Sequence, residues 1–311
     1  MKITDVEATV LVAKLPEPWQ IAGTIFRHSY MTLVRIRSDA GFTGYGECIV
    51  RHGPGATKAI VEEVLRPILV GKDPFEIEGR WDEMFMMLRN RGHHSGFFLE
   101  AMAGVDIALW DLMGKALNLP VHQLMGGFGR AHLPAYASSL LFKDLAALEK
   151  EAETLMAQGF KAVKLKVGKG LPEDIRNVKA IRKIIGEDVK LMVDANGAFD
   201  AATAVEVGKG LEDHGVYWFE EPVPPDDLPG YAALKRALTI RIAGGESLFS
   251  RFDFRDFIER RLLDVVQPDI ARAGGFTECR KIAAMASASH IPYAPHTGAS
   301  GALCVIASLH L

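Results

Sequence analysis

Cysteine, a dominant charge and long apolar runs are all scarce in this sequence. Its 3 cysteines, Cys48, Cys279 and Cys304, are far apart and show no ligand spacing with histidine. This excludes a disulfide framework and predicts buried thiols in a reducing cytoplasm. A formal charge of −3 excludes a broad basic face for nucleic acid. There is no run of about 18 apolar residues and no apolar leader, so we expect neither membrane insertion nor secretion.

What remains is the composition of an ordinary folded protein. Hydrophobic residues make up 49% of the chain and charged residues 24%, which excludes global disorder. The chain is long enough for two domains of ~150 residues, or for a barrel of about 250 residues with an appendage.

The first third of the chain has two different periodicities. Within residues 1–50, three runs alternate apolar and polar side chains and predict a small antiparallel sheet. Residues 15–30 contain Pro16 and Pro18 and are predicted to form a loop. Its Trp19, Arg27 and His28 suggest contact with a ligand, and packing on a neighbour is an equally open alternative. Residues 55–116 have helical periodicity, so we predict an α+β domain over residues 1–125.

From about residue 132 a strand-then-helix pattern repeats. One candidate strand lies near residue 136, and the others span residues 161–167, 189–195, 216–221, 240–245, 264–269 and 291–296. Strands that alternate with helices predict a parallel sheet. No glycine-rich dinucleotide turn follows the first strand, which favours a (β/α)-barrel of the TIM type over residues 126–311 instead of a doubly wound sheet.

A polar residue ends each of the last six predicted strands. The spacings between these residues are 28, 26, 26, 23 and 27, each about one strand-helix unit, and the residues are Lys166, Asp194, Glu220, Glu246, Asp269 and His296. In a barrel the carboxyl ends of the strands converge on one mouth, where active sites lie. The register therefore predicts an active site.

Two lysines lie on one predicted strand. Lys164 and Lys166 are two residues apart and face the same way, while Val163, Leu165 and Val167 face the other. If the apolar set faces the helices, the lysines point into the barrel; a strand with solvated lysines is the alternative. Repulsion between two confined ammonium groups predicts a lowered pKa for at least one, as a general base requires.

Three carboxylates from consecutive strands make a hard-oxygen ligand set. Asp194, Glu220 and Glu246 have no cysteine or histidine partner in this set, and oxygen ligands suit Mg²⁺. Any one of them could instead cap a helix or form a surface ion pair. Their shared position at three strand ends favours the metal site.

The remaining polar positions complete the predicted site. Asp269 and His296 end neighbouring strands, where the carboxylate would fix the imidazole tautomer and raise its basicity. Asn196 is predicted to orient substrate or a ligand. Glu221 points away from Glu220 in ideal strand geometry and is expected to support the site.

These groups together predict proton abstraction beside a carboxylate. Mg²⁺ would acidify the α-proton of a bound acid and hold the enediolate, Lys166 would remove the proton, and His296 would act from the opposite face. Return of a proton to the same carbon inverts its configuration. Protonation of a β-hydroxyl releases water and gives a 2-keto acid.

The motifs resemble those of the mandelate racemase subgroup of the enolase superfamily. They run through nearly the whole chain: AGVDIALWDLMGKALNLPVHQLMGG, KLKVG, VDAN, FEEP, GGES, PDIARAGG and PHTG. The resemblance implies that Lys166 is the base, that Lys164 steadies the substrate carboxylate, and that Asp269 and His296 form the dyad. The three strand-end carboxylates described above match the family's metal ligands. A muconate-lactonising member would have lysine in place of Asp269 and fits less well.

The resemblance also implies an architecture. It makes the N-terminal domain a cap, with specificity loops at residues 16–30 and 49–55, the second of which holds Arg51 and His52. It implies an eighth barrel strand and a tail, whereas this chain ends after seven of eight units, so the C-terminal barrel unit is expected to be absent. Either the sequence is a fragment, or closure is achieved another way, such as by a partner chain. An even-numbered homo-oligomer is a further expectation.

The favoured activity is dehydration of an aldonate-type acid sugar to a 2-keto-3-deoxy acid. A racemase or epimerase of a 2-hydroxy acid uses the same residues and stays open, as does a catalytically silent metal-binding homologue.

Overall fold

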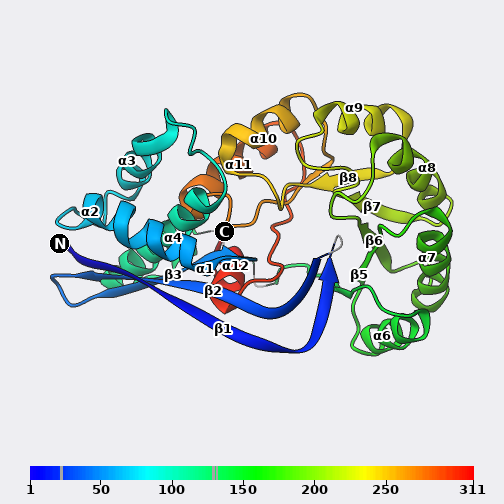
Figure 1. Ribbon diagram of the computed structural model, residues 1–311, viewed down its shortest axis with the longest axis horizontal. Coiled ribbons are helices and arrows are strands. Elements are labelled where there is room, and N and C mark those ends of the chain that lie inside the picture. Colours follow the sequence, from blue (N-terminus) through cyan, green and yellow to red (C-terminus); the bar gives the residue numbers. More distant parts are fainter. Residues whose placement is uncertain (22–23, 128–129, 131) are drawn as a thin grey trace.

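The computed structural model describes residues 1–21, 24–127, 130 and 132–311, in two regions (Figure 1). The N-terminal region is a three-stranded antiparallel sheet covered by helices, and the C-terminal region is a six-stranded parallel sheet with helices outside it. The predicted capping domain and parallel α/β domain are therefore present. None of the described helices is both long and apolar enough to span a bilayer. All three cysteines are free and buried.

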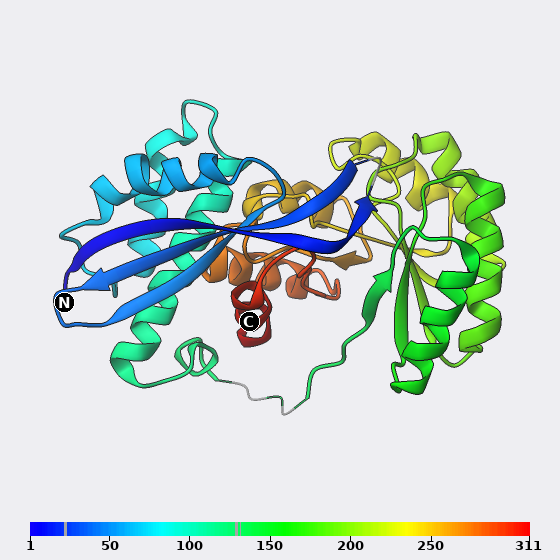
Figure 2. The ribbon, with the colours of Figure 1, turned by 60° about the horizontal axis from the view of Figure 1, so that its bottom comes forward.

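The cap sheet is a long meander. β1 (Ile3–Ile21), β2 (Thr24–Ser38) and β3 (Thr43–Val50) pair in that order. The prediction of a loop at residues 15–30 was wrong for residues 15–21 and 24–30, because Trp19 pairs with Phe26 and continues the hairpin; residues 22 and 23 lie outside the described residues. The two prolines fall within the register shift between Lys14 and Trp19, on an edge strand where a missing N–H is tolerated. Figures 1 and 2 show this hairpin reaching from the cap toward the parallel sheet.

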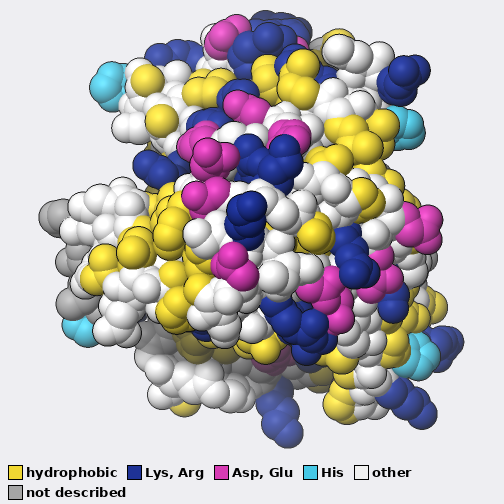
Figure 3. Space-filling model, turned by 90° about the vertical axis from the view of Figure 1, so that its left-hand side faces the viewer, with side chains coloured by type: hydrophobic (Ala, Val, Ile, Leu, Met, Phe, Trp, Pro, Cys, Tyr) yellow, Lys and Arg dark blue, Asp and Glu magenta, His cyan; other side chains and the backbone are white. Residues whose placement is uncertain are grey.

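Helices cover one side of the cap sheet. They are α1 (Pro54–Ala59), a π-helical turn η1 (Ile60–Leu65), α2 (Arg66–Leu69), α3 (Ile77–Arg89), α4 (Phe97–Leu117) and α5 (Val121–Leu124). The apolar helix α4 packs directly on β3, where Gly46 leaves no room for a side chain. A Cβ at Gly46 would come within 2.0 Å of the Gly104 carbonyl oxygen. On the cap face in Figure 3, basic and acidic side chains are interspersed, so neither sign of charge dominates this face.

The parallel sheet is curved, with helices on its outer face (Figure 2). Its strands, in spatial order, are β4 (Ala137–Leu140), β5 (Ala162–Lys166), β6 (Lys190–Asp194), β7 (Val216–Glu220), β8 (Arg241–Gly244) and β9 (Val265–Val266). The helices are α6 (Leu145–Ala157), α7 (Leu171–Ile185), α8 (Ala201–Glu212), α9 (Leu228–Ala237), α10 (Ser250–Glu259) and α11 (Gly275–Ala288). Among the described residues no strand pairing returns to β4, so barrel closure is not observed.

The predicted strand at residues 291–296 is reduced to two isolated bridges. Tyr293 bridges Val266, and His296 bridges Asp269. Pro292 and Pro295 lack the N–H that a continuous ladder needs, which explains why no regular strand forms. The bridge at His296 still carries that side chain to the end of the sheet.

The last helix, α12 (Ala302–His310), docks against the cap. The Glu47 carboxylate of β3 accepts hydrogen bonds from the backbone N–H groups of Gly301 (2.5 Å) and Cys304 (3.1 Å). A carboxylate at a helix N-terminus satisfies otherwise unpaired donors and interacts favourably with the helix dipole. This contact ties the segment that follows His296 to the cap.

Candidate active site

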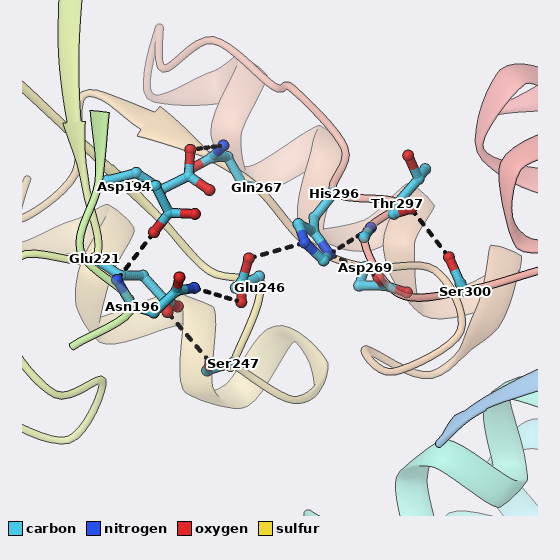
Figure 4. Close-up of polar contacts among 12 residues, drawn as sticks. Asp194, Asn196, Glu221, Glu246, Ser247, Gln267, Asp269, His296, Thr297 and Ser300 are labelled. Carbon is cyan, nitrogen blue, oxygen red and sulfur yellow. Dashed lines mark hydrogen bonds and ion pairs between the residues drawn. The ribbon is translucent and has the colours of Figure 1, made fainter. Parts of the chain in front are cut away.

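The carboxyl ends of the parallel strands bring the predicted polar residues together. Lys166 pairs in register with Asp194, and Asp194 with Glu220. Asp194, Glu220 and Glu246 each offer an oxygen within 4.8 Å of the others, and all three side chains are buried. Figure 4 shows how Asp194 and Glu246 lie relative to their neighbours. The site therefore consists of converging oxygen ligands enclosed by protein.

Both lysines of β5 point into this cluster. Lys164 Nζ lies 2.5 Å from Glu220 Oε1 and 3.3 Å from Asp194 Oδ2. Lys166 forms an ion pair with Asp194 and donates to Asn196 Oδ1 at 2.7 Å. The residues that alternate with them, Val163 and Leu165, are fully buried. The two faces of the strand thus divide as their alternation predicted.

The electrostatics of Lys164 differ from the expectation of a lowered pKa. Burial lowers the pKa of this ammonium, but the carboxylates of Glu220 and Asp194 outweigh it, so the pKa is raised well above its ordinary value. The repulsion argument considered only the two lysines. The carboxylates of Glu220 and Asp194, 2.5 and 3.3 Å from the Lys164 ammonium, favour its charged form and therefore raise its pKa.

His296 lies between two carboxylates (Figure 4). Its Nδ1 is 2.8 Å from Asp269 Oδ2 and its Nε2 is 2.8 Å from Glu246 Oε2. Burial lowers the pKa of the imidazole, but Glu246 and Asp269 raise it by more than burial lowers it, so that the pKa is raised to about 9. Carboxylates that face both nitrogens favour the charged form of the ring, in which both nitrogens donate.

Asn196 and Glu221 both follow a strand in left-handed backbone conformation, with φ of 46° and 36°. Asn196 donates from Nδ2 to Glu246 Oε1 at 3.2 Å, so it bridges Lys166 and Glu246. The strand ends at Glu220, so Glu221 does not follow ideal alternation and is buried beside the carboxylates. Burial and then the Glu246 charge raise the pKa of Glu221 to about 8. Ser247 donates to its Oε2 at 3.4 Å.

Arg51 is a site residue that the motif reasoning placed only in a cap loop. Its Nη2 donates to Glu246 Oε1 at 3.2 Å, joining the cap to the end of β8. A basic residue directly after a buried strand was the available signal. Its partner, 195 residues away, could not be identified from the sequence.

The predicted cap contacts divide into two groups. Trp19 stacks on Phe26 at 4.4 Å between ring centroids, and Phe26 stacks on His52 at 5.2 Å. Arg27 and His28 are exposed on β2. In the part of the chain that the structure describes, no hydrogen bond or ion pair joins these predicted residues to the carboxylate cluster.

Two donors below Glu220 were missed entirely. Trp218 Nε1 and Gln267 Nε2 both donate to Glu220 Oε2, at 3.0 and 2.9 Å. Trp218 precedes Glu220 by two residues, and Gln267 precedes Asp269 by two. The same alternation that aligned the lysines could therefore have placed both on the face of the sheet that carries the site.

The chain matches two families that cover almost all of it. Residues 5–126 match the mandelate racemase / muconate lactonizing enzyme N-terminal domain, and residues 147–311 match the enolase C-terminal domain-like family. The resemblance in the motifs is thereby confirmed at the level of both domains.

Named relatives and solved structures agree. The chain is 35% identical over 305 residues to D-galactarolactone cycloisomerase of Agrobacterium fabrum, covering 97% of this chain and 80% of that protein. It is 38% identical over 280 residues to arabinonate dehydratase of Saccharolobus solfataricus, covering 89% and 74%. A racemase from Streptomyces coelicolor with bound magnesium superposes with a TM-score of 0.92 at 35% identity, covering 98% and 85%. The chain belongs to the enolase superfamily, as an enzyme of the mandelate racemase type.

Proposed function

We propose that this protein is a Mg²⁺-dependent dehydratase of an aldonate-type acid sugar. The observation that carries the proposal is the arrangement of Lys166 and His296 at opposite ends of one buried carboxylate cluster. The arabinonate dehydratase relative supports the substrate class.

The carboxylates fit a magnesium ion. Asp194, Glu220 and Glu246 provide only oxygen, which is the donor that Mg²⁺ prefers, and their oxygens lie close enough to share one ion. A bound Mg²⁺ would stabilise the negative charge that develops on the substrate carboxylate during proton abstraction.

The two lysines have different roles beside the substrate carboxylate. Lys164, with its raised pKa, stays charged and holds one carboxylate oxygen. Lys166 lies two residues further along β5, toward the carboxyl end of the strand, where a hydrogen bond to Asn196 orients its ammonium. In its neutral form Lys166 accepts the α-proton of the acid.

His296 completes the elimination. Its imidazolium donates a proton to the β-hydroxyl as the carbon–oxygen bond breaks, so water leaves and an enol remains. Asp269 fixes the ring through Nδ1 and stabilises its charge. Tautomerisation of the enol gives the 2-keto-3-deoxy acid. Substrate contacts from Asn196, Glu221, Trp19, Arg27, His28 and His52, and an even-numbered homo-oligomer, belong to the same proposal.

The experiment follows the α-proton by NMR in D₂O with Mg²⁺ and a panel of acid sugars. A 2-keto product is expected, and Lys166→Ala and His296→Asn should each slow its formation by about 10²–10⁴-fold. Lys169→Ala is the matched control, because this lysine follows Lys166 by three residues and its exposed ammonium forms an ion pair with Glu173.

Other outcomes identify other activities. Inversion with deuterium uptake and no 2-keto acid would make the protein a racemase or epimerase. Conversion of a sugar lactone would favour cycloisomerisation, which the Agrobacterium relative supports. Mg²⁺ binding without any exchange would indicate a silent homologue.

A further inference from the structure

Glu220 is held differently from the other two carboxylates of the cluster. Its Oε2 accepts two hydrogen bonds from uncharged donors, Trp218 Nε1 at 3.0 Å and Gln267 Nε2 at 2.9 Å. Its Oε1 faces the opposite way, toward the Lys164 ammonium that Asp194 shares.

The two donors are fixed by their surroundings. Gln267 is fully buried and Trp218 is 5% exposed. The Trp218 ring meets the Tyr136 ring edge-on at 5.4 Å, and Tyr136 in turn lies against Lys164. Because neither donor can turn to water, both keep their bonds to Oε2 whatever occupies the mouth.

A carboxylate held in this way offers one oxygen. The two uncharged donors use the lone pairs of Oε2, so Oε1 alone remains for a cation beside Asp194 and Glu246. Mg²⁺ takes single oxygens in a tight octahedron at about 2.0–2.1 Å, whereas Ca²⁺ takes 6–8 oxygens at about 2.3–2.6 Å and accepts both oxygens of one carboxylate.

We infer that Trp218 and Gln267 are positioning residues that keep Glu220 a one-oxygen ligand and so favour Mg²⁺ over Ca²⁺. The inference rests on the proposed metal site. It goes further in assigning the choice of cation to side chains that do not touch the ion. A purely structural role predicts lost stability with no change in the preference between cations.

The test is calorimetric titration of the full, metal-stripped chain with Mg²⁺ and separately with Ca²⁺. Trp218→Phe removes one N–H and keeps an aromatic ring, and Gln267→Leu removes the other donor at similar volume. Trp110→Phe is the matched control, because Trp110 is also buried and its Nε1 donates at 3.0 Å to Thr277, away from the site.

Outer partners of metal ligands typically contribute about 10–100-fold in affinity. We expect the affinity for Mg²⁺ to fall by about that factor in Trp218→Phe and Gln267→Leu, and the affinity for Ca²⁺ to fall less. The ratio of the Mg²⁺ affinity to the Ca²⁺ affinity should therefore decrease. Trp110→Phe should lose stability but keep the wild-type ratio. If Gln267→Leu fails to fold, Trp218→Phe still carries the test.

An equal loss of affinity for both cations, or unchanged affinities in the two variants, would overturn the inference and leave the proposed function standing. A shifted ratio in Trp110→Phe would also overturn it. If the unaltered chain bound neither cation, the proposed metal chemistry would fail along with the inference, and the unaltered chain alone would reveal that.

Discussion

Two buried polar clusters in this protein are built on opposite principles. One is the contact between the cap and α11, where Trp81 Nε1 donates to the Gly274 carbonyl at 2.8 Å and Trp110 Nε1 to Thr277 Oγ1 at 3.0 Å. Asp106 of α4 accepts from the Thr277 backbone N–H at 3.1 Å. The other is the strand-end site, where the buried carboxylates are Asp194, Glu220, Glu221, Glu246 and Asp269.

The difference separates groups that stabilise the fold from groups that are suited to chemistry. At α11 each of these donors meets an acceptor, so burying them costs little. In the site, carboxylates face other carboxylates, and the pKa of Glu221 is raised to about 8 by burial and by Glu246, Asp194 and Glu220. Such repulsion destabilises the fold and would be relieved by a bound cation, which is typical of functional sites.

The largest expected effect breaks the α11 contact. Trp81 is fully buried, so Trp81→Ala should lower the free energy of unfolding by about 3–5 kcal/mol, from lost packing and a cavity. Denaturant titration measures this. Trp19→Ala, which alters the stack of a half-buried Trp19 on Phe26 in the hairpin, should cost clearly less. A loss below about 1 kcal/mol in Trp81→Ala would show that the cap does not depend on this contact.

The strand-end register was predictable because the sequence itself encodes it. Spacings close to one strand-helix unit place Asp194 and Glu220 at the same depth, and alternation puts Lys164 and Lys166 on one face. Convergence of these side chains therefore needed no tertiary information beyond the parallel sheet. Residues that support them by the same alternation, such as Trp218, were also accessible in principle.

Contacts across the two regions were not predictable. Arg51 reaches Glu246 only because the cap docks over the strand ends. Residues 15–30 were predicted as a loop because of their prolines, but pairing with β2 overrides that local preference. In both cases the outcome depends on a partner distant in sequence.

A moderate effect of opposite sign tests the cost of the site. Between about pH 4.5 and its folded pKa of about 8, Glu221 holds a proton in the folded protein that the unfolded chain has lost, so stability falls as pH rises through that window. Glu221→Gln should therefore raise the free energy of unfolding at about pH 8 by about 0.5–2 kcal/mol, and hardly at about pH 4. Chelator should be present during denaturation.

Added Mg²⁺ should cancel that gain. A cation beside Glu221 favours the ionised carboxylate and so relieves the repulsion in the unaltered chain. If Glu221→Gln is destabilising at every pH, with or without Mg²⁺, the site is not under electrostatic strain and the contrast between the two clusters fails.

The smallest effect concerns Asp106, whose pKa is also raised, but for a different reason. Burial raises it from 3.8 to about 7, and its Oδ1 has no hydrogen-bond partner among the described residues. The folded protein thus retains a proton between these values, and stability falls as pH rises through the window. Asp106→Asn keeps an oxygen for the Thr277 N–H and removes this titration. Between about pH 4 and pH 8 the free energy of unfolding of the variant should rise, relative to that of the unaltered chain, by less than about 1 kcal/mol.

Mg²⁺ should not change the gain of Asp106→Asn, because no like charge of the strand-end site is a leading cause of its raised pKa. The paired titrations therefore distinguish a carboxyl group whose pKa is raised mainly by burial from one whose pKa is also raised by the carboxylates of the strand-end site. A Mg²⁺-dependent gain in stability in Asp106→Asn would mean that the α11 contact and the strand-end site are energetically coupled.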